Sequence, residues 1–250
     1  MKKILLGAAA AIAIAAPSVA SAETNAVIGA HYGNTDFDGF DFDSYGINGA
    51  FSHDMHGGVL QMDGRWNRLD IGSGAPDLGN SYGAIHYGMR NDSHSFAGFV
   101  GLSDFFSLSG TGVGVEGQMF LGNFNLNGSL GFATYDDALD ATHVQIDGAY
   151  FFTPNLAVTA LVGVTEVDFD SGGDTDFTTY GVGGEWRFDG SPFSLTGGYR
   201  NHDFDGGDAD SWMIGFNVDL GTGSVQERTR SGPGFNGAEA LFGAVGTLVP

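Results

Sequence analysis

Carboxylates recur beside glycine and phenylalanine in three stretches of the chain, residues 36–43, 168–176 and 203–210. Alternating carboxylates on a flexible backbone offer the hard oxygen ligands that calcium prefers. The spacing and the final glutamate of an EF-hand loop are missing, so we favour solvated, mutually repelling loops. Binding of a divalent cation, or bridging to anionic surface lipid, is the alternative. The candidate metal ligands are Asp36, Asp38, Asp41, Asp168, Asp170, Asp203, Asp205 and Asp208.

A second set of polar residues lies at alternate positions in segments whose other positions are apolar. Alternate residues of a β-strand face the same side of the sheet, so these side chains would share one face. Charges of both signs are tolerated there only if water surrounds them or if they pair with one another. The set comprises Gln61, Asp63, Arg65, Glu116, Gln118, Gln145, Asp147, Glu185, Arg187, Arg200, Asn217 and Asp219.

Histidine is the remaining residue type that could carry chemistry. A catalytic triad or dyad needs histidine within reach of a nucleophile or a carboxylate. His202 precedes Asp203, His53 and His56 fall in a predicted turn, and His143 begins a predicted strand. No spacing among them implies such a pair. We therefore predict solvent-exposed histidines and no enzymatic activity.

Twelve segments of alternating apolar and polar residues would position these side chains. Most are about nine to ten residues long, which matches the roughly 9–11 residues that a tilted transmembrane β-strand needs. Strands of soluble proteins are shorter, about 5–6 residues. The predicted strands are residues 25–33, 44–52, 58–67, 81–90, 95–103, 112–120, 124–132, 143–151, 155–164, 177–188, 193–200 and 211–220.

The links between the predicted strands alternate between short and long. Five short links carry the Gly, Pro, Asn and Asp that turns prefer, and six longer ones include the acidic stretches. Short turns at one rim and long loops at the other, with an even strand number, are typical of bacterial outer-membrane barrels. The sequence thus predicts an all-β fold, an antiparallel transmembrane up-and-down β-barrel of about 12 strands.

The two ends of the chain differ from this pattern. A basic start, an apolar run over residues 4–16 and the small residues Ala20-Ser21-Ala22 are typical of a secretory signal peptide. We predict three parts: a signal peptide at 1–22, the barrel at 23–220 and a C-terminal tail at 221–250. The chain has no cysteine, so an exported protein would depend on its core or on a closed sheet without free edges rather than on disulfides.

The charge balance is strongly acidic, with a formal net charge of −21. Removal of the signal peptide would take away both lysines and leave seven arginines against thirty acidic residues, a net charge of −23. Phosphate binding needs a basic surface, so nucleic acid is excluded as a partner. Acidic loops around a mouth would instead concentrate cations.

The last predicted strand ends in Gly215, Val218 and Leu220 at a Gly-x-x-apolar-x-apolar spacing. This resembles the signal by which the outer-membrane assembly machinery recognises terminal strands. Over residues 23–220 the chain resembles the small porin-like β-barrels of Gram-negative bacteria. The resemblance implies a place in the outer membrane, contact with its lipid and passive diffusion of small hydrophilic solutes. The signal normally closes the chain on an aromatic residue, whereas thirty residues follow Leu220 here.

Three interpretations of the barrel stay open from sequence. It is a narrow, cation-preferring channel, or a non-conducting barrel whose acidic loops bind divalent cations or surface ligands, or a secreted soluble β-protein. We favour the first, because twelve strands lie between the filled interior of eight and the open pore of sixteen. For the tail we favour a flexible periplasmic extension. The alternative is that residues 238–245 plug the lumen or dock beneath it.

Overall fold

The computed structural model describes residues 24–37, 39–55, 58–70, 78–106, 108–136, 138–221 and 223–246. The predicted signal peptide, residues 1–22, lies outside these ranges. The described residues form twelve strands and two short helices. The helices are α2 (Val225–Ser231) and α3 (Gly237–Val245). The strands are β1 (Thr24–Phe37), β2 (Phe40–Met55), β3 (Gly58–Asp70), β4 (Leu78–Arg90), β5 (His94–Phe105), β6 (Leu108–Leu121), β7 (Phe124–Tyr135), β8 (Leu139–Thr153), β9 (Leu156–Phe169), β10 (Asp174–Arg187), β11 (Phe193–Phe204) and β12 (Gly207–Asp219).

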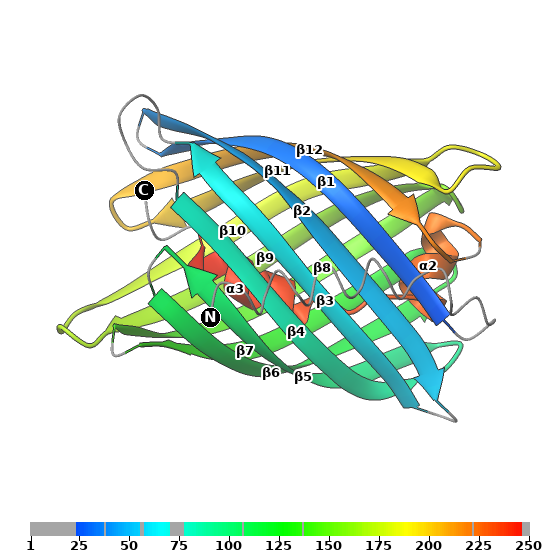
Figure 1. Ribbon diagram of the computed structural model, residues 1–250, viewed down its shortest axis with the longest axis horizontal. Helices are drawn as coiled ribbons and strands as arrows, with labels where there is room; N and C mark the ends of the chain where they lie inside the picture. Colours follow the sequence, from blue (N-terminus) through cyan, green and yellow to red (C-terminus); the bar gives the residue numbers. More distant parts are fainter. Residues whose placement is uncertain are drawn as a thin grey trace.

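Each strand pairs antiparallel with the next, and β1 pairs with β12 to close the sheet into a barrel (Figure 1). The predicted fold class is therefore confirmed. We call the end where β1 meets β2 the loop end, and the end where β1 begins and β12 finishes the turn end. Closure leaves no free sheet edge, which explains how a chain without cysteine holds together.

The strands are longer than predicted, 12 to 16 residues, and most of the extra length lies at the loop end. β1 continues to Phe37 and β2 resumes at Phe40, so the predicted loop over residues 34–43 is mostly hairpin. The physical reason is the sequence of that stretch. Asp and Phe alternate through it with period two, which suits a strand as well as the apolar alternation below it.

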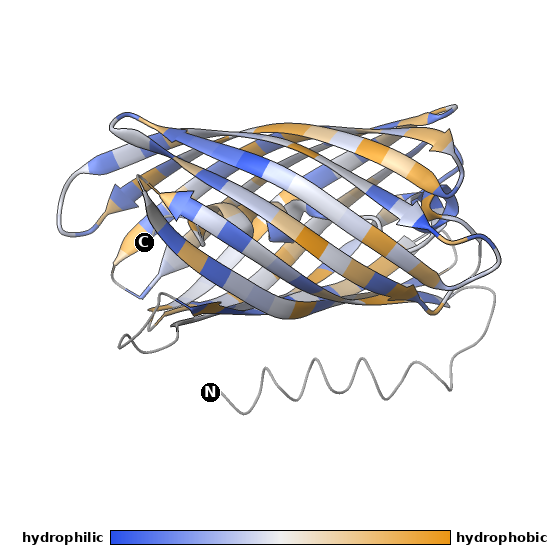
Figure 2. Cartoon of the chain, turned by 90° about the horizontal axis from the view of Figure 1, so that it is seen from above, coloured by the Kyte–Doolittle hydropathy of each residue, from blue (hydrophilic) through white to orange (hydrophobic). Residues whose placement is uncertain are grey.

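The outward face of the barrel is apolar. Large apolar side chains such as Ile146, Val182 and Ile214 are about half exposed, as expected of residues that face lipid. Aromatic pairs stand near both ends, Tyr32 against Trp212 toward the loop end and Trp186 against Phe188 at the turn end. These pairs match the interfacial girdles of transmembrane barrels. In Figure 2 hydrophilic residues gather on the hairpins beside the C label, and apolar residues colour much of the remaining wall.

Helices contribute little to the described residues. None of them is long and apolar enough to cross a membrane.

Residues 223–246, which we call the C-terminal segment, enter the lumen. α2 lies at the turn end, and α3 lies inside the barrel (Figure 1). α3 packs mainly against β4, β5, β6, β7 and β8, and Ala238, Leu241 and Val245 are fully buried. The favoured expectation of a flexible periplasmic extension is therefore wrong for these residues, and the plug alternative agrees with the structure. Burial of the apolar face of α3 is the reason.

Candidate functional site in the barrel lumen

The structure places the predicted polar set on the inner face of the wall. All twelve residues are buried or half-buried, and most neighbour an exposed apolar residue on the same strand. Many of them contact the C-terminal segment rather than open water. The residues that do so through a hydrogen bond or an ion pair are Gln61, Arg65, Glu116, Gln118, Asp147, Glu185 and Asp219.

Arg228 of α2 anchors the segment at the turn end. Its Nη1 donates to Glu185 Oε1 and to Asp219 Oδ1, each at 2.9 Å, and Arg187 adds a second cation 3.3 Å from Asp219. The side chains are 11%, 14% and 2% exposed for Arg228, Glu185 and Asp219. Burial opposes the charge on the guanidinium, but the two carboxylates outweigh it and raise the pKa of Arg228. The anchor is a buried charge cluster in which each ion depends on the others.

A second anchor lies deeper, around His86. Its Nε2 is 2.6 Å from Asp63 Oδ1, and its Nδ1 contacts Glu116 Oε1. The other oxygen of Glu116 accepts hydrogen bonds from the backbone N–H groups of Asn236 and Gly237, at 2.9 and 2.8 Å. These are the first N–H groups of α3, so the carboxylate caps the helix where its dipole favours negative charge.

Two glutamines hold the extended stretch between α2 and α3. Gln61 Nε2 donates to the carbonyl of Phe235 at 2.7 Å, and Phe235 N donates back to Gln61 Oε1 at 3.0 Å. Gln118 donates to the carbonyl of Gly234, and the Phe235 ring stacks on His86 with 5° between the planes. The side chains thus satisfy backbone groups that would otherwise be buried without partners.

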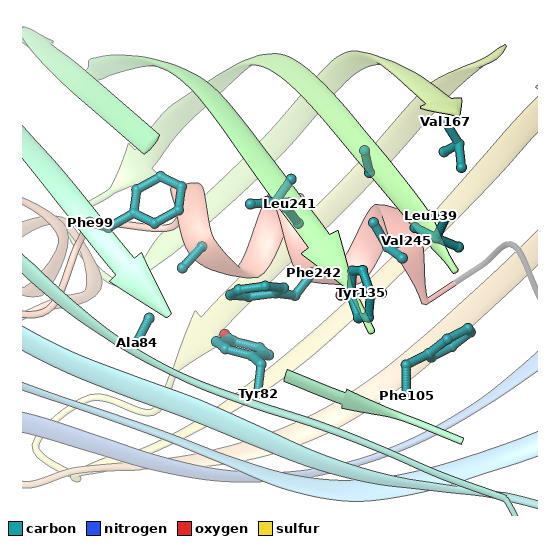
Figure 3. Packing of buried hydrophobic residues seen from close by; sticks show 13 residues of the cluster. Tyr82, Ala84, Phe99, Phe105, Tyr135, Leu139, Val167, Leu241, Phe242 and Val245 are labelled. Atoms are coloured by element: carbon teal, nitrogen blue, oxygen red, sulfur yellow. The ribbon is translucent and has the colours of Figure 1, made fainter. Parts of the chain in front are cut away.

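The part of the wall that α3 contacts carries a groove lined by glycines of β5, β6 and β7. A Cβ on Gly101 would lie 2.6 Å from the Phe242 ring, one on Gly112 would lie 2.7 Å from it, and one on Gly131 would lie 2.9 Å from Leu241. Each distance is too short for a real Cβ. A side chain at any of the three positions would therefore require Phe242 or Leu241 to shift. Figure 3 shows both of these side chains on α3 among the buried residues of the wall.

The ion pair between Glu239 of α3 and Arg65 of β3 is partly exposed to solvent. Glu239 pairs with Arg65, and their side chains are 34% and 17% exposed although both lie inside the closed wall. The Arg65 guanidinium holds the pKa of the Glu239 carboxyl below its usual value. Arg200, on β11, is half-buried, and its charge interacts with those of Glu239 and Asp147. The side of α3 that carries Glu239 therefore borders a charged, solvent-accessible part of the lumen.

The sequence matches no protein-family model and no curated protein. Solved structures with the same architecture do exist. A KdgM porin matches with a TM-score of 0.52 at 13% identity, over 76% of this chain and 98% of that chain, and with 0.51 as its complex with disordered oligogalacturonate. The β-domain of the Bordetella autotransporter BrkA matches with a TM-score of 0.50 at 13% identity, over 78% and 99%. The chain has the fold of the outer-membrane β-barrels.

The histidines of this barrel are not placed as the sequence predicts. His143 and His202 are both 2% exposed, on the inner face of the wall, where their Nδ1 atoms lie 2.9 Å from hydroxyls of Thr165 and Thr179. They are buried because the strands extend through the predicted loops. His53 contacts Thr24 at 2.9 Å, and His56 lies outside the described residues.

His86 corrects the prediction that no histidine pairs with a carboxylate. Its alternation with Tyr82 and Ala84 along β4 places it on the inner face, and this was the signal in the sequence. Asp63, His86 and Glu116 are at most 8% exposed and are held by the C-terminal segment, which assigns them a structural role. The absence of enzymatic activity stays a prediction.

Carboxylates face one another across strands at the loop end of the barrel. Asp36 pairs with Asp210 on one side and Asp41 on the other, and Asp203 pairs with Asp208. No group of three or more His, Asp or Glu within the described ranges is arranged to hold a metal ion. Calcium binding at the candidate ligands stays a prediction from sequence. Asp38 lies outside the described residues, and Asp170 and Asp205 follow the ends of β9 and β11.

Three aspartates lie side by side across β8, β9 and β10, and we expect removal of the middle charge to stabilise the barrel. Asp168 lies opposite both Asp140 and Asp174, and like charges directly opposite destabilise a sheet by about 0.2–1 kcal/mol per pair. We expect Asp168→Asn to raise the melting temperature in low salt and to lose the effect in high salt. Asp205→Asn, between the strand ends at the same rim, is the control that should change nothing. Equal effects of the two variants would contradict the pairing argument.

Proposed function

We propose that this barrel is a narrow channel for passive diffusion of small hydrophilic solutes across the outer membrane of a Gram-negative bacterium. The observation that carries the proposal is the partial exposure of Arg65 and Glu239 inside a closed wall. Ions at that depth keep a free energy close to that in water only if water reaches them. A hydrated, charged lumen is what a diffusion channel uses to pass polar solutes and to select among them.

The position of α3 supports an incomplete plug. Its main contacts are with β4 to β8, which leaves the facing half of the wall available to line a passage. Many inward residues in the middle of that half are polar or small and half-buried, whereas Phe177 and His202 are buried toward the loop end. The half-buried residues include Asn48, Thr159, Gly183, Thr196, Ser211 and Asn217. Twelve strands give a lumen intermediate between a filled and an open barrel, so a helix along one side would narrow the lumen without filling it.

Cation preference is the finer part of the proposal. Pairs such as Asp36 with Asp41 and Asp203 with Asp208 crowd negative charge at the loop end. The formal net charge of the chain is −21, and the summed field of such a mouth attracts cations and repels anions. The positive charge of Arg200 repels cations inside the lumen. The acidic mouth, rather than the interior, would therefore supply the preference for cations.

Conductance of the purified protein in a planar bilayer tests both parts. Under a salt gradient we expect discrete current steps and a reversal potential of the sign that marks cation flow. Asp36→Asn with Asp41→Asn should lower the preference, whereas Asp92→Asn at the turn end should leave it. A reversal potential favouring anions would refute the preference, and a silent membrane would refute the channel.

A non-conducting barrel is the second candidate. It is favoured by the buried Asp63, His86 and Glu116 cluster, in which wall charges pair with one another instead of facing water. In that case the acidic hairpins would act by binding divalent cations or surface ligands. Silent bilayers with correctly folded protein would support this candidate.

A further inference from the structure

We propose that the C-terminal segment is a displaceable plug, so that the barrel has a narrow conducting state with the segment docked and a wider one with it withdrawn. This inference rests on the proposed channel. It goes beyond it by assigning the segment a gating activity and the barrel a second, larger class of permeating solutes.

The segment leaves the barrel wall complete when it withdraws. The pairing of β1 with β12 closes the sheet without it, over residues 27–37 of β1. Within the lumen the wall holds the segment through side chains, for example Gln61 on Phe235 and Glu116 on the start of α3. Since none of the described strands pairs with it, its withdrawal breaks no strand ladder, and the backbone hydrogen bond from Gln226 N to the carbonyl of Pro154 lies in a turn.

The wall that the segment would uncover is of mixed character. Asp63, Glu116, Gln118, Asn125 and Asp147 project from it, and each can exchange a hydrogen bond to the protein for one to water. Apolar wall side chains that pack around α3, such as Tyr82, Phe99 and Leu139, would also enter water, which disfavours withdrawal. Because the sheet stays closed without the segment, an emptied lumen would be a wider aqueous pore.

Apolar side chains of the segment favour the docked state over the withdrawn one. Leu241, Phe242 and Val245 are at most 3% exposed when docked and would enter water on withdrawal, which disfavours the wide state. The ionic anchor at Arg228 adds a contribution that salt weakens only partly, because the cluster is mostly buried. The docked state should therefore dominate, with the wide state appearing as brief openings.

An engineered disulfide between the wall and α3 would hold the plug in place. The chain has no cysteine of its own, so two introduced cysteines have no competing partner. A Cβ on Gly131 would lie 3.3 Å from Leu241 Cβ, just below the roughly 3.5–4.5 Å that disulfides span, so a shift of α3 by a few tenths of an ångström allows the bond. In Gly131→Cys with Leu241→Cys, we expect only the small current step when oxidised. Reduction should restore transitions to a larger step, and deletion of residues 222–250 should give the larger step alone.

A matched control places the bridge within the wall. Ile146 and Val162 pair between β8 and β9 and both face outward, and the Cβ atoms of directly opposite residues lie about 4.5–5.5 Å apart. Ile146→Cys with Val162→Cys should therefore form a disulfide, after a small shift, that does not tether the segment. Both current steps should persist in this variant under oxidising conditions.

Thiol labelling supplies a second measurement that does not need the double variants to fold. In Ala238→Cys the thiol replaces a side chain that is fully buried when the segment is docked. A water-soluble maleimide should label it slowly, and faster when Arg228→Gln is added. Labelling at the rate of an exposed thiol without that change would overturn the docked ground state.

The outcomes separate this inference from the proposed channel. If the deletion variant and the locked variant give the same current step as the unaltered protein, the gating inference fails and the channel stands. If the unaltered protein is silent but the deletion variant conducts, the plug stands and the resting channel fails. If every form is silent, both fail.

Discussion

Replacement of Arg228 by glutamine is expected to undock the C-terminal segment from the turn end of the barrel. The substitution leaves Glu185 and Asp219 buried, with Arg187 as the one remaining guanidinium of the cluster. Removal of one partner from a buried ion cluster costs about 3–5 kcal/mol. Since 1.4 kcal/mol is a factor of ten, the withdrawn fraction should rise on the order of a hundredfold or more. The rate of maleimide labelling of Ala238→Cys measures this rise.

Arg230→Gln is the matched control for that experiment. Arg230 lies on the same helix, where its Nε donates to Asn125 Oδ1 at 2.9 Å and its guanidinium lies 5.5 Å from the centre of the Phe120 ring. Its Nη2 also donates to the carbonyl of Gly122, and its guanidinium lies 5.9 Å from the centre of the Phe151 ring. Since no ion pair is assigned to it in the described residues and it is half-exposed, its loss should cost about 1.5–3 kcal/mol, less than the loss of Arg228. Equal labelling rates for the two variants would show that the charge cluster is not the anchor.

Truncation of Phe242 to alanine is the second large perturbation. Its ring lies in the glycine groove and stacks on Tyr82 with 5.6 Å between ring centres, and it is 3% exposed. A buried Phe→Ala change costs about 3–5 kcal/mol, because the cavity it leaves is filled only in part. We expect long-lived wide openings in the bilayer and faster labelling at Ala238→Cys. The temperature at which the sheet itself unfolds should change less.

A substitution in the glycine groove should disrupt the packing of Phe242 without any change to Phe242 itself. Gly112→Val would place methyl groups where the Phe242 ring lies, and overpacking of this kind costs about 1–3 kcal/mol. It should open the channel in the same direction as Phe242→Ala. Phe216→Ala, on the outward face of β12, is the control and should leave gating unchanged. An unaltered current pattern in both groove variants would contradict the role assigned to Phe242.

The strand framework could be predicted because its determinants are local. Period-two alternation, as from Phe124 to Phe132, and turn residues such as Asn91 and Asp92 act over a few neighbours. The loop-end boundaries differ from the prediction for a related reason. Acidic residues at alternate positions are typical of a solvated loop, but the same alternation also suits a strand, and the pairing of β1 with β2 continues through Asp36 and Asp41.

Docking of the C-terminal segment could not be predicted in the same way, because its binding surface is assembled from distant parts of the chain. Leu241, Phe242 and Val245 share one face of a short helix, a pattern that the sequence displays. The groove that receives them needs glycines from β5, β6 and β7 side by side, and none of these glycines has a local signature. The His86 cluster likewise joins β3, β4 and β6.

The place of the C-terminal segment in the chain has a consequence for biogenesis. The segment follows β12 in the chain, whereas its binding groove is formed by strands far earlier in the sequence. The surface that receives α3 exists only once β4 to β8 lie side by side, so docking of α3 has to follow the pairing of these strands. The strand that resembles an assembly signal then stands inside the chain rather than at its end. Machinery that reads it would have to accept a polypeptide that continues past Leu220 and turns back into the barrel.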